Sequence, residues 1–279
     1  MAKIIDGGAL AVKIKNEIKA EIERDNLEVG LAVILVGEDP ASQIYVKHKK
    51  KDCEECGITS HEYVLPEKTE TGELLALIDS LNQNPSVNGI LVQQPLPRHI
   101  DAVACNERIS PLKDVDAFRA DNVGRIMTGG FSLPSCTPAG VMEMLRSEGI
   151  SAAGKECVVV GRSNIVGKPM AMLLLHEHGT VTICHSKTVG LAGICRRADI
   201  LVAAIGKANF ITADFVKKGA VVIDVGMNRN ENNKLCGDVD FAGVEPLADY
   251  ITPVPGGVGP MTRAMLMKNT LTAHKLQSK

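Results

Sequence analysis

Short apolar runs alternate with amphipathic stretches along almost the whole chain, and this alternation limits the possible folds more than any other feature. The apolar runs are rich in valine and isoleucine and have the length of buried strands, at residues 31–37, 89–93, 157–161, 181–184, 200–205 and 220–225. Stretches with helical periodicity separate them, near residues 9–24, 41–56, 71–83, 138–148, 166–177 and 212–218. This order is typical of β-α-β units, so we predict an α/β fold with mostly parallel sheets.

A break in this pattern between residues 118 and 137 divides the chain. The stretch from Asp121 to Thr137 contains three glycines and one proline and has no clear period. A length of 279 residues also suits two domains of ordinary size. We therefore predict a first domain at residues 1–120, a second at residues 121–259, and a C-terminal helix at residues 260–279 that packs back on the first domain.

Composition excludes several classes of function. The chain has 31 basic and 33 acidic residues, a balance that argues against a nucleic-acid partner. No apolar run approaches the roughly 20 residues that span a bilayer, and Met1–Leu10 lacks the apolar core of a signal peptide. The eight cysteines form no disulfide framework. We predict a cytoplasmic protein with reduced thiols and no membrane partner.

The start of the second domain has the form of a phosphate site. A strand ends at Gly161, a turn follows, and a helical run begins after Gly167. This arrangement presents backbone N–H groups and the positive end of a helix to a phosphate. The spacing G-x-S-x-x-x-G differs from the usual dinucleotide pattern, so a tight β-α turn without a ligand is the alternative. Gly206 and Gly226 end two further strands and favour a ligand at this edge.

The next strand indicates which dinucleotide would bind. NAD sites usually place an acidic residue about 20 residues after the glycine turn. Here the strand 181–184 is followed by His185, Ser186 and Lys187, with no carboxylate. Arg162 and Ser186 suit a 2′-phosphate, which favours NADP over NAD. The alternative is that these are solvated loop residues.

The helix predicted at residues 41–56 carries a lysine on its less polar face. One arc of this helix holds Ser42, Tyr45, Val46, Lys49, Cys53 and Cys56. A lysine that faces inward loses hydration, and its lowered pKa suits acid–base chemistry. The alternative is a buried stem with the amine in water. No second cysteine pair completes a metal site with Cys53 and Cys56, so we interpret them as buried thiols and predict no metal.

Polar groups elsewhere complete a candidate site. Gln93 ends a strand where ligands of α/β sheets bind, and Asp116 suits a substrate nitrogen or a turn. The glycine-rich segment 252–262 has the composition of a ligand-lining loop. Thr137 and Pro138 are typical of a helix N-cap and the first helical position.

Together these segments resemble the bifunctional methylenetetrahydrofolate dehydrogenase/cyclohydrolase family. The matching segments are residues 42–49, 89–97, 113–118, 136–140, 160–169 and 251–262, in order along the chain. The resemblance implies a Rossmann-like NADP-binding second domain, a cleft between the domains and a homodimer. It also implies that tetrahydrofolate derivatives are the substrates: methylenetetrahydrofolate gives hydride to NADP, and water opens the methenyl product to 10-formyltetrahydrofolate.

The resemblance also implies residue roles. Lys49 is expected to be the central catalytic residue, Gln93 to adjust it, Asp116 to hold the pterin and Tyr45 to stack on the folate. Further substrate contacts are expected from Val92, Pro255, Gly256, Gly257, Val258 and Gly259. The expected NADP contacts are Gly161, Arg162, Ser163, Gly167, Ser186 and Met227.

Ala117 departs from the family pattern, which has glycine after the second aspartate of Asp-Val-Asp. The added methyl group bears on the position of Asp116. Two other functions remain open at this stage. An NADP dehydrogenase of another small substrate, such as a shikimate-type enzyme, requires only the second half of the chain. A dinucleotide-sensing or scaffold module requires no catalytic Lys49.

Overall fold

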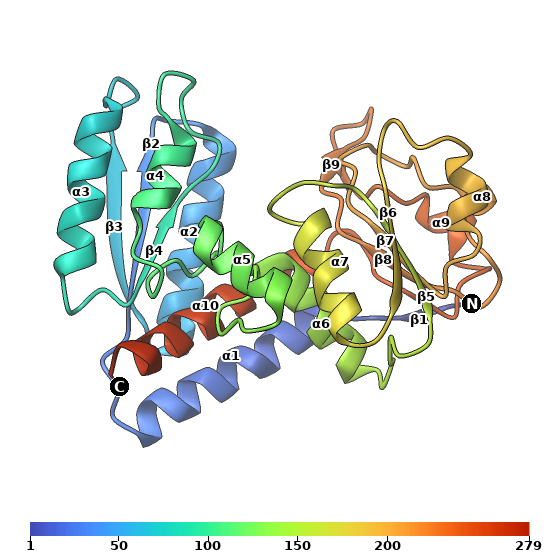
Figure 1. Ribbon diagram of the computed structural model, residues 1–279, viewed down its shortest axis with the longest axis horizontal. Coiled ribbons are helices and arrows are strands. Elements are labelled where there is room, and N and C mark those ends of the chain that lie inside the picture. Colours follow the sequence, from blue (N-terminus) through green and yellow to red (C-terminus); the bar gives the residue numbers. More distant parts are fainter. Residues whose placement is uncertain (279) are drawn as a thin grey trace. The chain divides into compact units, whose positions relative to one another are not determined.

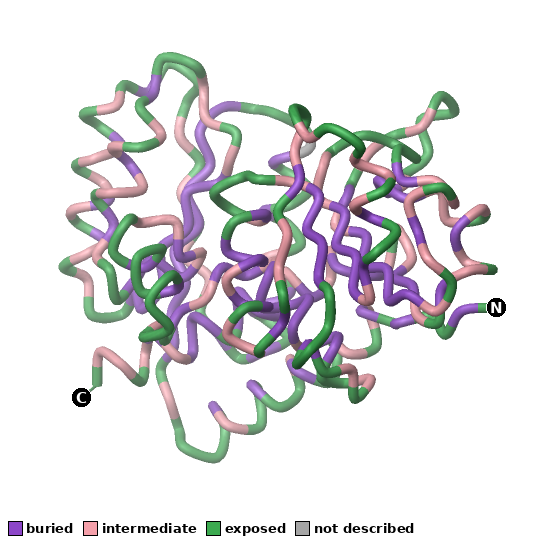
Figure 2. The backbone as a smooth tube through the Cα atoms, turned by 45° about the vertical axis from the view of Figure 1, so that its right-hand side comes forward, coloured by how far each residue is buried: buried purple, intermediate pink, exposed green. Residues whose placement is uncertain are grey.

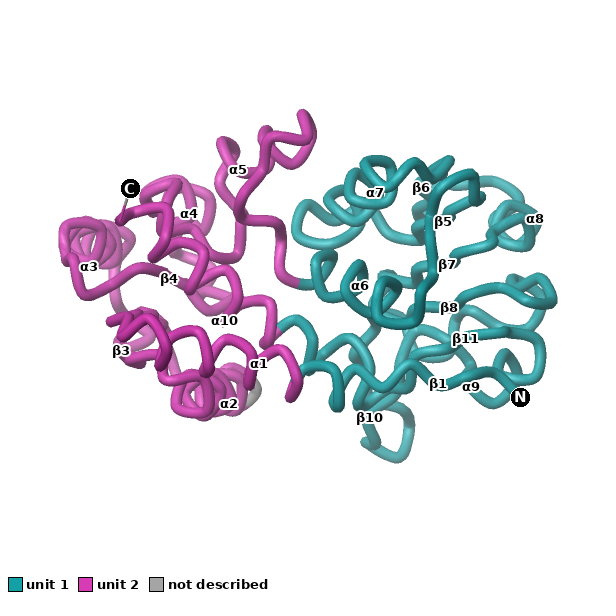
Figure 3. Tube along the Cα trace, turned by 90° about the horizontal axis from the view of Figure 1, so that it is seen from below, with its two compact units in different colours: residues 1–11, 137–262 teal, residues 12–136, 263–279 magenta. Residues whose placement is uncertain are grey.

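The computed structural model describes residues 1–278, apart from the side chain of Ala41, and the chain forms two compact units (Figures 1 and 3). Unit 1 contains residues 1–11 and 137–262, and unit 2 contains residues 12–136 and the segment that begins at Arg263. The division after residue 136 differs from the sequence-based boundary after residue 120. Helix α5 (Ala120–Thr128) lies in unit 2, where Asn122 donates hydrogen bonds to Pro111 O and Asp114 Oδ2.

Unit 2 contains a three-stranded parallel sheet in the order β3-β2-β4. Its strands are β2 (Gly30–Val36), β3 (Thr59–Leu65) and β4 (Gly89–Val92), and its helices include α2 (Pro40–Cys56), α3 (Thr71–Gln83) and α4 (Ala102–Arg108). Every residue of β2 is buried, as expected for a central strand. One face of the sheet packs against the apolar residues of α3 and α4. Helices α1 (Gly7–Arg24) and α10 (Val258–Gln277) contribute residues to both units.

Unit 1 contains a six-stranded parallel sheet in the order β1-β11-β8-β7-β5-β6. The strands are β1 (Lys3–Ile4), β5 (Glu156–Val160), β6 (Thr180–Cys184), β7 (Ile200–Ala203), β8 (Val221–Asp224) and β11 (Tyr250–Ile251). From β5 the chain goes first to β6 on one side and then to β7 on the other. Ligands of open α/β sheets bind where the strand order reverses in this way, which points to the carboxyl ends of these three strands.

The remaining elements of unit 1 are short or flank the sheet. They are α6 (Cys136–Ser147), α7 (Gly167–His176), α8 (Leu191–Cys195), the 3₁₀ turn η1 (Ala213–Phe215), α9 (Phe241–Val244) and the antiparallel pair β9 (Asn228–Arg229) and β10 (Leu235–Cys236).

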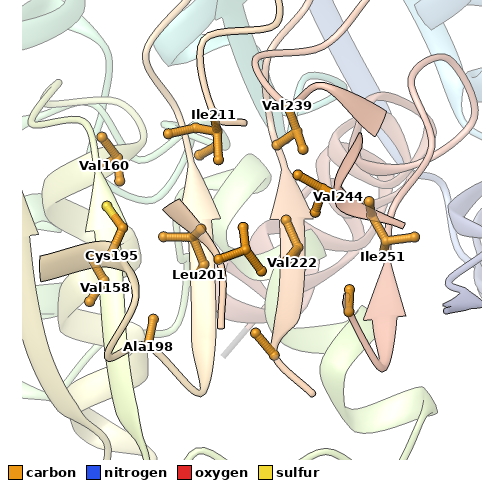
Figure 4. Packing of buried hydrophobic residues seen from close by; sticks show 14 of the residues in the cluster. Val158, Val160, Cys195, Ala198, Leu201, Ile211, Val222, Val239, Val244 and Ile251 are labelled. Atoms are coloured by element: carbon orange, nitrogen blue, oxygen red, sulfur yellow. The ribbon is translucent and has the colours of Figure 1, made fainter. Parts of the chain in front are cut away.

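The core of unit 1 follows from the register of its strands. Val158, Leu201, Val222 and Ile251 are successive partners across β5, β7, β8 and β11, so their side chains form one apolar row (Figure 4). Figure 2 shows the same concentration of buried residues along the central strands of each sheet. The close packing of this apolar row fixes the strands whose carboxyl ends form the candidate site.

The six predicted strands are confirmed, and several other local predictions are wrong. The stretch 212–218 forms only the 3₁₀ turn η1, since Val216 has extended backbone angles and is buried in the core. The stretch 121–137, predicted to be irregular, contains α5. Strand β3 was not predicted, because its polar side chains lie at the edge of the sheet. Among the residues described, no helix is both long and apolar enough to cross a membrane.

Candidate active site

Helix α2 places Lys49 on the inward side of unit 2. The helix starts after Asp39, whose carboxylate accepts a hydrogen bond from Ser42 N at 2.7 Å, and it ends before the left-handed Gly57. Ser42, Val46, Cys53 and Cys56 are buried, as the predicted arc requires, and both cysteines are free thiols. Tyr45 is 38% exposed, more than the arc implies, because it lies at the margin of the buried stripe one turn before Lys49.

Gln93 is the direct partner of Lys49. The Nζ atom of Lys49 donates a hydrogen bond to Gln93 Oε1 at 2.7 Å. Gln93 is buried and directly follows Val92, the last residue of β4, and its backbone N donates to Ile34 O at 2.8 Å. The pairing to β2 thus fixes the amide beside the helix. A neutral acceptor binds an unprotonated amine as well as an ammonium ion, so the pair does not force a charge on Lys49.

Asp116 belongs to the same site, and its segment is held by its neighbours. Asp114 accepts hydrogen bonds from Phe118 N at 3.2 Å and Arg119 N at 2.9 Å. Between these residues, Ala117 is fully buried and has φ 57°, a left-handed conformation that favours glycine. The alanine that replaces the family's glycine at residue 117 therefore adopts a strained, left-handed backbone conformation.

Burial shifts the two ionisable groups of the site in opposite directions. Burial lowers the pKa of Lys49, and the negative charge of Asp116 opposes this shift. Burial raises the pKa of Asp116, against the opposing charge of Lys49. Both shifts favour the neutral forms of the two groups, and groups with shifted pKa values in one site are candidates for proton transfer with a bound ligand.

Three neighbours of Lys49 were missed by sequence reasoning. Cys136 has its thiol beside Asp116 and donates to Val115 O at 3.3 Å. Asp52 and Arg263 contribute opposite charges near the amine. The position of Cys136 at the start of the Cys-Thr-Pro motif was the only signal for it. Thr137, predicted to be an N-cap, lies within α6, and its hydroxyl is 3.0 Å from Thr262 Oγ1.

Unit 1 has a cavity of about 300 Å³ at the carboxyl ends of β5, β6 and β7. It brings together four residues predicted to bind the cofactor, namely Gly161, Arg162, Ser163 and Ser186. It also includes His185, Lys207 and Phe210, which were not predicted. The lining contains two permanent cations and no carboxylate, so it suits an anionic ligand.

Glycine is required at the turn into α7. Gly161 has φ 142°, and a Cβ atom there would lie 2.2 Å from Ala204 O. Gly167 lies at the start of α7 rather than in the cavity wall, and a Cβ atom on it would lie 2.2 Å from Gly161 O. The helix end therefore packs directly on the glycine turn, which is how a phosphate site at a helix N-terminus is built.

A second, smaller cavity of unit 1 has a volume of about 70 Å³. It brings Met227 together with the whole predicted loop, Pro255, Gly256, Gly257, Val258 and Gly259. Asp224 also lines it, and burial raises the pKa of Asp224 to about 6. Among the described residues, no group of three or more His, Cys, Asp or Glu side chains is arranged to hold a metal ion.

Comparison with known proteins places these features in a family. The model of the tetrahydrofolate dehydrogenase/cyclohydrolase catalytic domain matches residues 5–116, and that of the family's NAD(P)-binding domain matches residues 135–278. The bifunctional protein FolD of Acetivibrio thermocellus is 58% identical over 281 residues, which cover 100% of this chain and 99% of the relative.

Solved structures agree with this assignment. The bifunctional FolD methylenetetrahydrofolate dehydrogenase/cyclohydrolase of Campylobacter jejuni has a TM-score of 0.97 and 49% identity, over 99% of this chain and 100% of that chain. The methylenetetrahydrofolate dehydrogenase-cyclohydrolase of Trypanosoma brucei, solved with NADP and an inhibitor, has a TM-score of 0.94 and 39% identity, over 100% and 99% of the two chains. This chain belongs to the tetrahydrofolate dehydrogenase/cyclohydrolase family.

Proposed function

We propose that the protein oxidises 5,10-methylenetetrahydrofolate to 5,10-methenyltetrahydrofolate with NADP and then hydrolyses the product to 10-formyltetrahydrofolate. The observation that carries this proposal is the hydrogen bond from Lys49 to Gln93 beside Asp116, in a chain of this family. It supports a catalytic Lys49 over a solvated one, because burial lowers the pKa of the amine. The sensor and scaffold functions require no such group.

The residues of unit 1 fit NADP. The glycine turn at Gly161 lines the cavity before the N-terminus of α7, and Arg162 with Ser186 suits the 2′-phosphate in a cavity whose lining has no carboxylate. Ser163, which lines the same cavity, Gly167 and Met227 complete the proposed contacts. Within the turn, Ser163 Oγ accepts hydrogen bonds from Val166 N and Gly167 N at 3.2 Å and so holds the turn in place. NADP, when bound, accepts the hydride, so this step requires no protein base.

Unit 2 is proposed to bind the folate and to carry out the hydrolysis. Tyr45 is proposed to stack on the ring system, Asp116 to bind the pterin and Val92 to make a further contact. The loop 255–259, which belongs to unit 1, is proposed as a separate folate contact. Lys49 directs one N–H group to Gln93, which orients the amine lone pair. Water adds to the methenyl carbon and gives one proton to Lys49 Nζ. The new hydroxyl group then loses its second proton as the formyl C=O bond forms and the bond from this carbon to N5 breaks, and N5 takes up one proton, so that one proton is released overall.

We also propose a homodimer in the cytoplasm. The outer edge of β3 has no strand partner among the described residues, and Val64 on this strand is 65% exposed. All eight cysteines are free thiols, which suits a reducing compartment. Light scattering coupled to gel filtration would measure the mass, and a monomer at assay concentration would contradict the dimer.

The test is a spectrophotometric assay with methylenetetrahydrofolate and either NADP or NAD, which follows the reduced cofactor and the methenyl product separately. We expect NADP reduction with little accumulated methenyl product. In Lys49→Met, hydrolysis is expected to disappear while NADP affinity stays unchanged, since the two sites use different residues. The exposed Lys47 on the same helix gives a matched control, Lys47→Met. Full hydrolysis by Lys49→Met would contradict the proposed role.

A further inference from the structure

A buried ion-pair group lies one helical turn after Lys49. Asp52 is three residues further along α2, so its side chain projects from the same side of the helix. Asp52 is 2% exposed and contacts two cations. Lys15 Nζ is 2.8 Å from Asp52 Oδ1, and Arg263 Nη1 of α10 is 3.1 Å from Asp52 Oδ2. A buried carboxylate with two cations this close to a catalytic amine requires an explanation beyond stability, because buried ion pairs contribute little net stability.

The two sides of this group differ in how their charges are compensated. Lys15 also pairs with Glu55, so its charge is shared between two carboxylates. Arg263 contacts Asp52 as a charge alone, because no described donor makes a directed hydrogen bond to Asp52 Oδ2. Its side chain is 29% exposed, against 4% for that of Asp52. The single contact at 3.1 Å thus holds the guanidinium group at a defined place beside Asp52, one helical turn from Lys49.

Each charged neighbour of Lys49 either raises or lowers the pKa of its amine. Asp116, from the segment after β4, raises the pKa of Lys49 and favours the ammonium form. Burial raises the pKa of the Cys136 thiol, on α6, well above its usual value, so this thiol brings no charge to Lys49. Asp52, on α2 itself, also raises the pKa of Lys49. Arg263 of α10 lowers it and so acts together with burial. Of the neighbours named here, Arg263 carries the positive charge, and this charge is permanent across the pH range in which the enzyme works.

We propose that Arg263 is a positioning residue for catalysis: Asp52, one helical turn from Lys49, holds the guanidinium group at 3.1 Å, so that its permanent positive charge opposes protonation of the lysine amine that is to accept the proton of the attacking water. The idea rests on the proposed role of Lys49. It assigns a function to the Asp52–Arg263 pair in the hydrolytic step, and it predicts that the two partners affect Lys49 in opposite directions.

The test compares Arg263→Gln with Asp52→Asn. Protein labelled with ¹³C at the lysine Cε is titrated by NMR, and the Lys49 signal is identified by its loss in Lys49→Met. We expect Arg263→Gln to raise the pKa of Lys49 by about one unit and Asp52→Asn to lower it by about one unit, each about tenfold in the ratio of neutral to charged amine. The acid limb of the pH profile for methenyl hydrolysis should move with each pKa.

Two further variants control for structural damage. Arg263→Lys keeps the positive charge and should bring the Lys49 pKa closer to that of the parent than Arg263→Gln does. Arg108→Gln breaks the exposed pair of Arg108 with Asp79 and should leave Lys49 unchanged. If either Asp52→Asn or Arg263→Gln fails to fold, the other variant, compared with Arg263→Lys, still shows whether the pKa of Lys49 shifts in the direction expected from the charge removed.

The outcomes separate this inference from the proposed function. An unchanged Lys49 pKa in Arg263→Gln, or a shift in the same direction in both variants, would overturn the inference whatever the enzyme catalyses. Opposite shifts of the Lys49 pKa in the two variants support the effect of the Asp52–Arg263 pair on Lys49, even if the pH profile of hydrolysis does not move with the pKa. In that case the catalytic role of Lys49 fails, and the part of the inference that concerns water activation fails with it.

Discussion

A substitution at Asp238 tests which side chain fixes the backbone turn in the wall of the larger cavity. This carboxylate is completely buried and accepts hydrogen bonds from three consecutive backbone N–H groups. Ile205 N is 2.6 Å and Gly206 N 3.1 Å from Oδ2, and Lys207 N is 2.8 Å from Oδ1. Asn228 Nδ2 also donates to Oδ1, at 2.9 Å. Ile205 and Lys207 both line the proposed NADP cavity, so Asp238 shapes its wall.

The cost of Asp238→Asn follows from these bonds. An asparagine keeps one acceptor oxygen and turns the other position into a donor that faces N–H groups, so two charge-assisted bonds are lost. Each contributes about 1.5–3 kcal/mol, which gives a loss of about 3–6 kcal/mol in the free energy of unfolding. The loosened turn should also raise the KM for NADP by about tenfold, equivalent to about 1.4 kcal/mol. The KM for methylenetetrahydrofolate should stay unchanged.

Urea unfolding and steady-state kinetics measure these effects. Asp240→Asn provides the matched control, because Asp240 caps only the short helix α9 through Gly243 N at 3.4 Å. Its expected cost is below about 1 kcal/mol. A loss below about 1 kcal/mol in Asp238→Asn, or an unchanged KM for NADP in the folded variant, would refute the reasoning.

Three further predictions concern the same two sites. Gln93→Glu places a carboxylate 2.7 Å from Lys49 Nζ and should stabilise the ammonium form; hydrolysis at pH 7 should fall about 100-fold and recover at higher pH, unlike in Gln93→Met. Gly161→Ala should abolish NADP binding in an equilibrium titration, because its Cβ would lie 2.2 Å from Ala204 O. The raised pKa of Asp224, about 6, means that the folded state holds this proton more tightly than the unfolded state. Its contribution to stability should therefore be lost as pH rises from about 4 to 6, by about 3 kcal/mol, and urea unfolding of Asp224→Asn should lack this slope.

Local periodicity was sufficient for the fold class and for part of the site. The six predicted strands can be recognised in the sequence by their runs of branched apolar residues, because a strand covered on both faces excludes polar side chains. The inward position of Lys49 follows from the helical repeat alone. The glycine turn at Gly161 is visible because only glycine adopts that backbone conformation. Local signals were misleading where short elements form, as at η1, because a few residues carry too little periodicity.

Contacts between distant segments required the tertiary structure. The sequence shows a lysine, a glutamine and two aspartates, but it does not show that Gln93 rather than a carboxylate accepts the Lys49 hydrogen bond. The helical repeat places Asp52 at the margin of the less polar arc of α2, but it does not show that the carboxylate is buried, which requires the charges of Lys15 and Arg263 from two other helices. Helical and strand repeats determine which way a side chain faces within its own element. Which element then packs against that face depends on the burial and charge of the whole unit, and only the folded chain decides it.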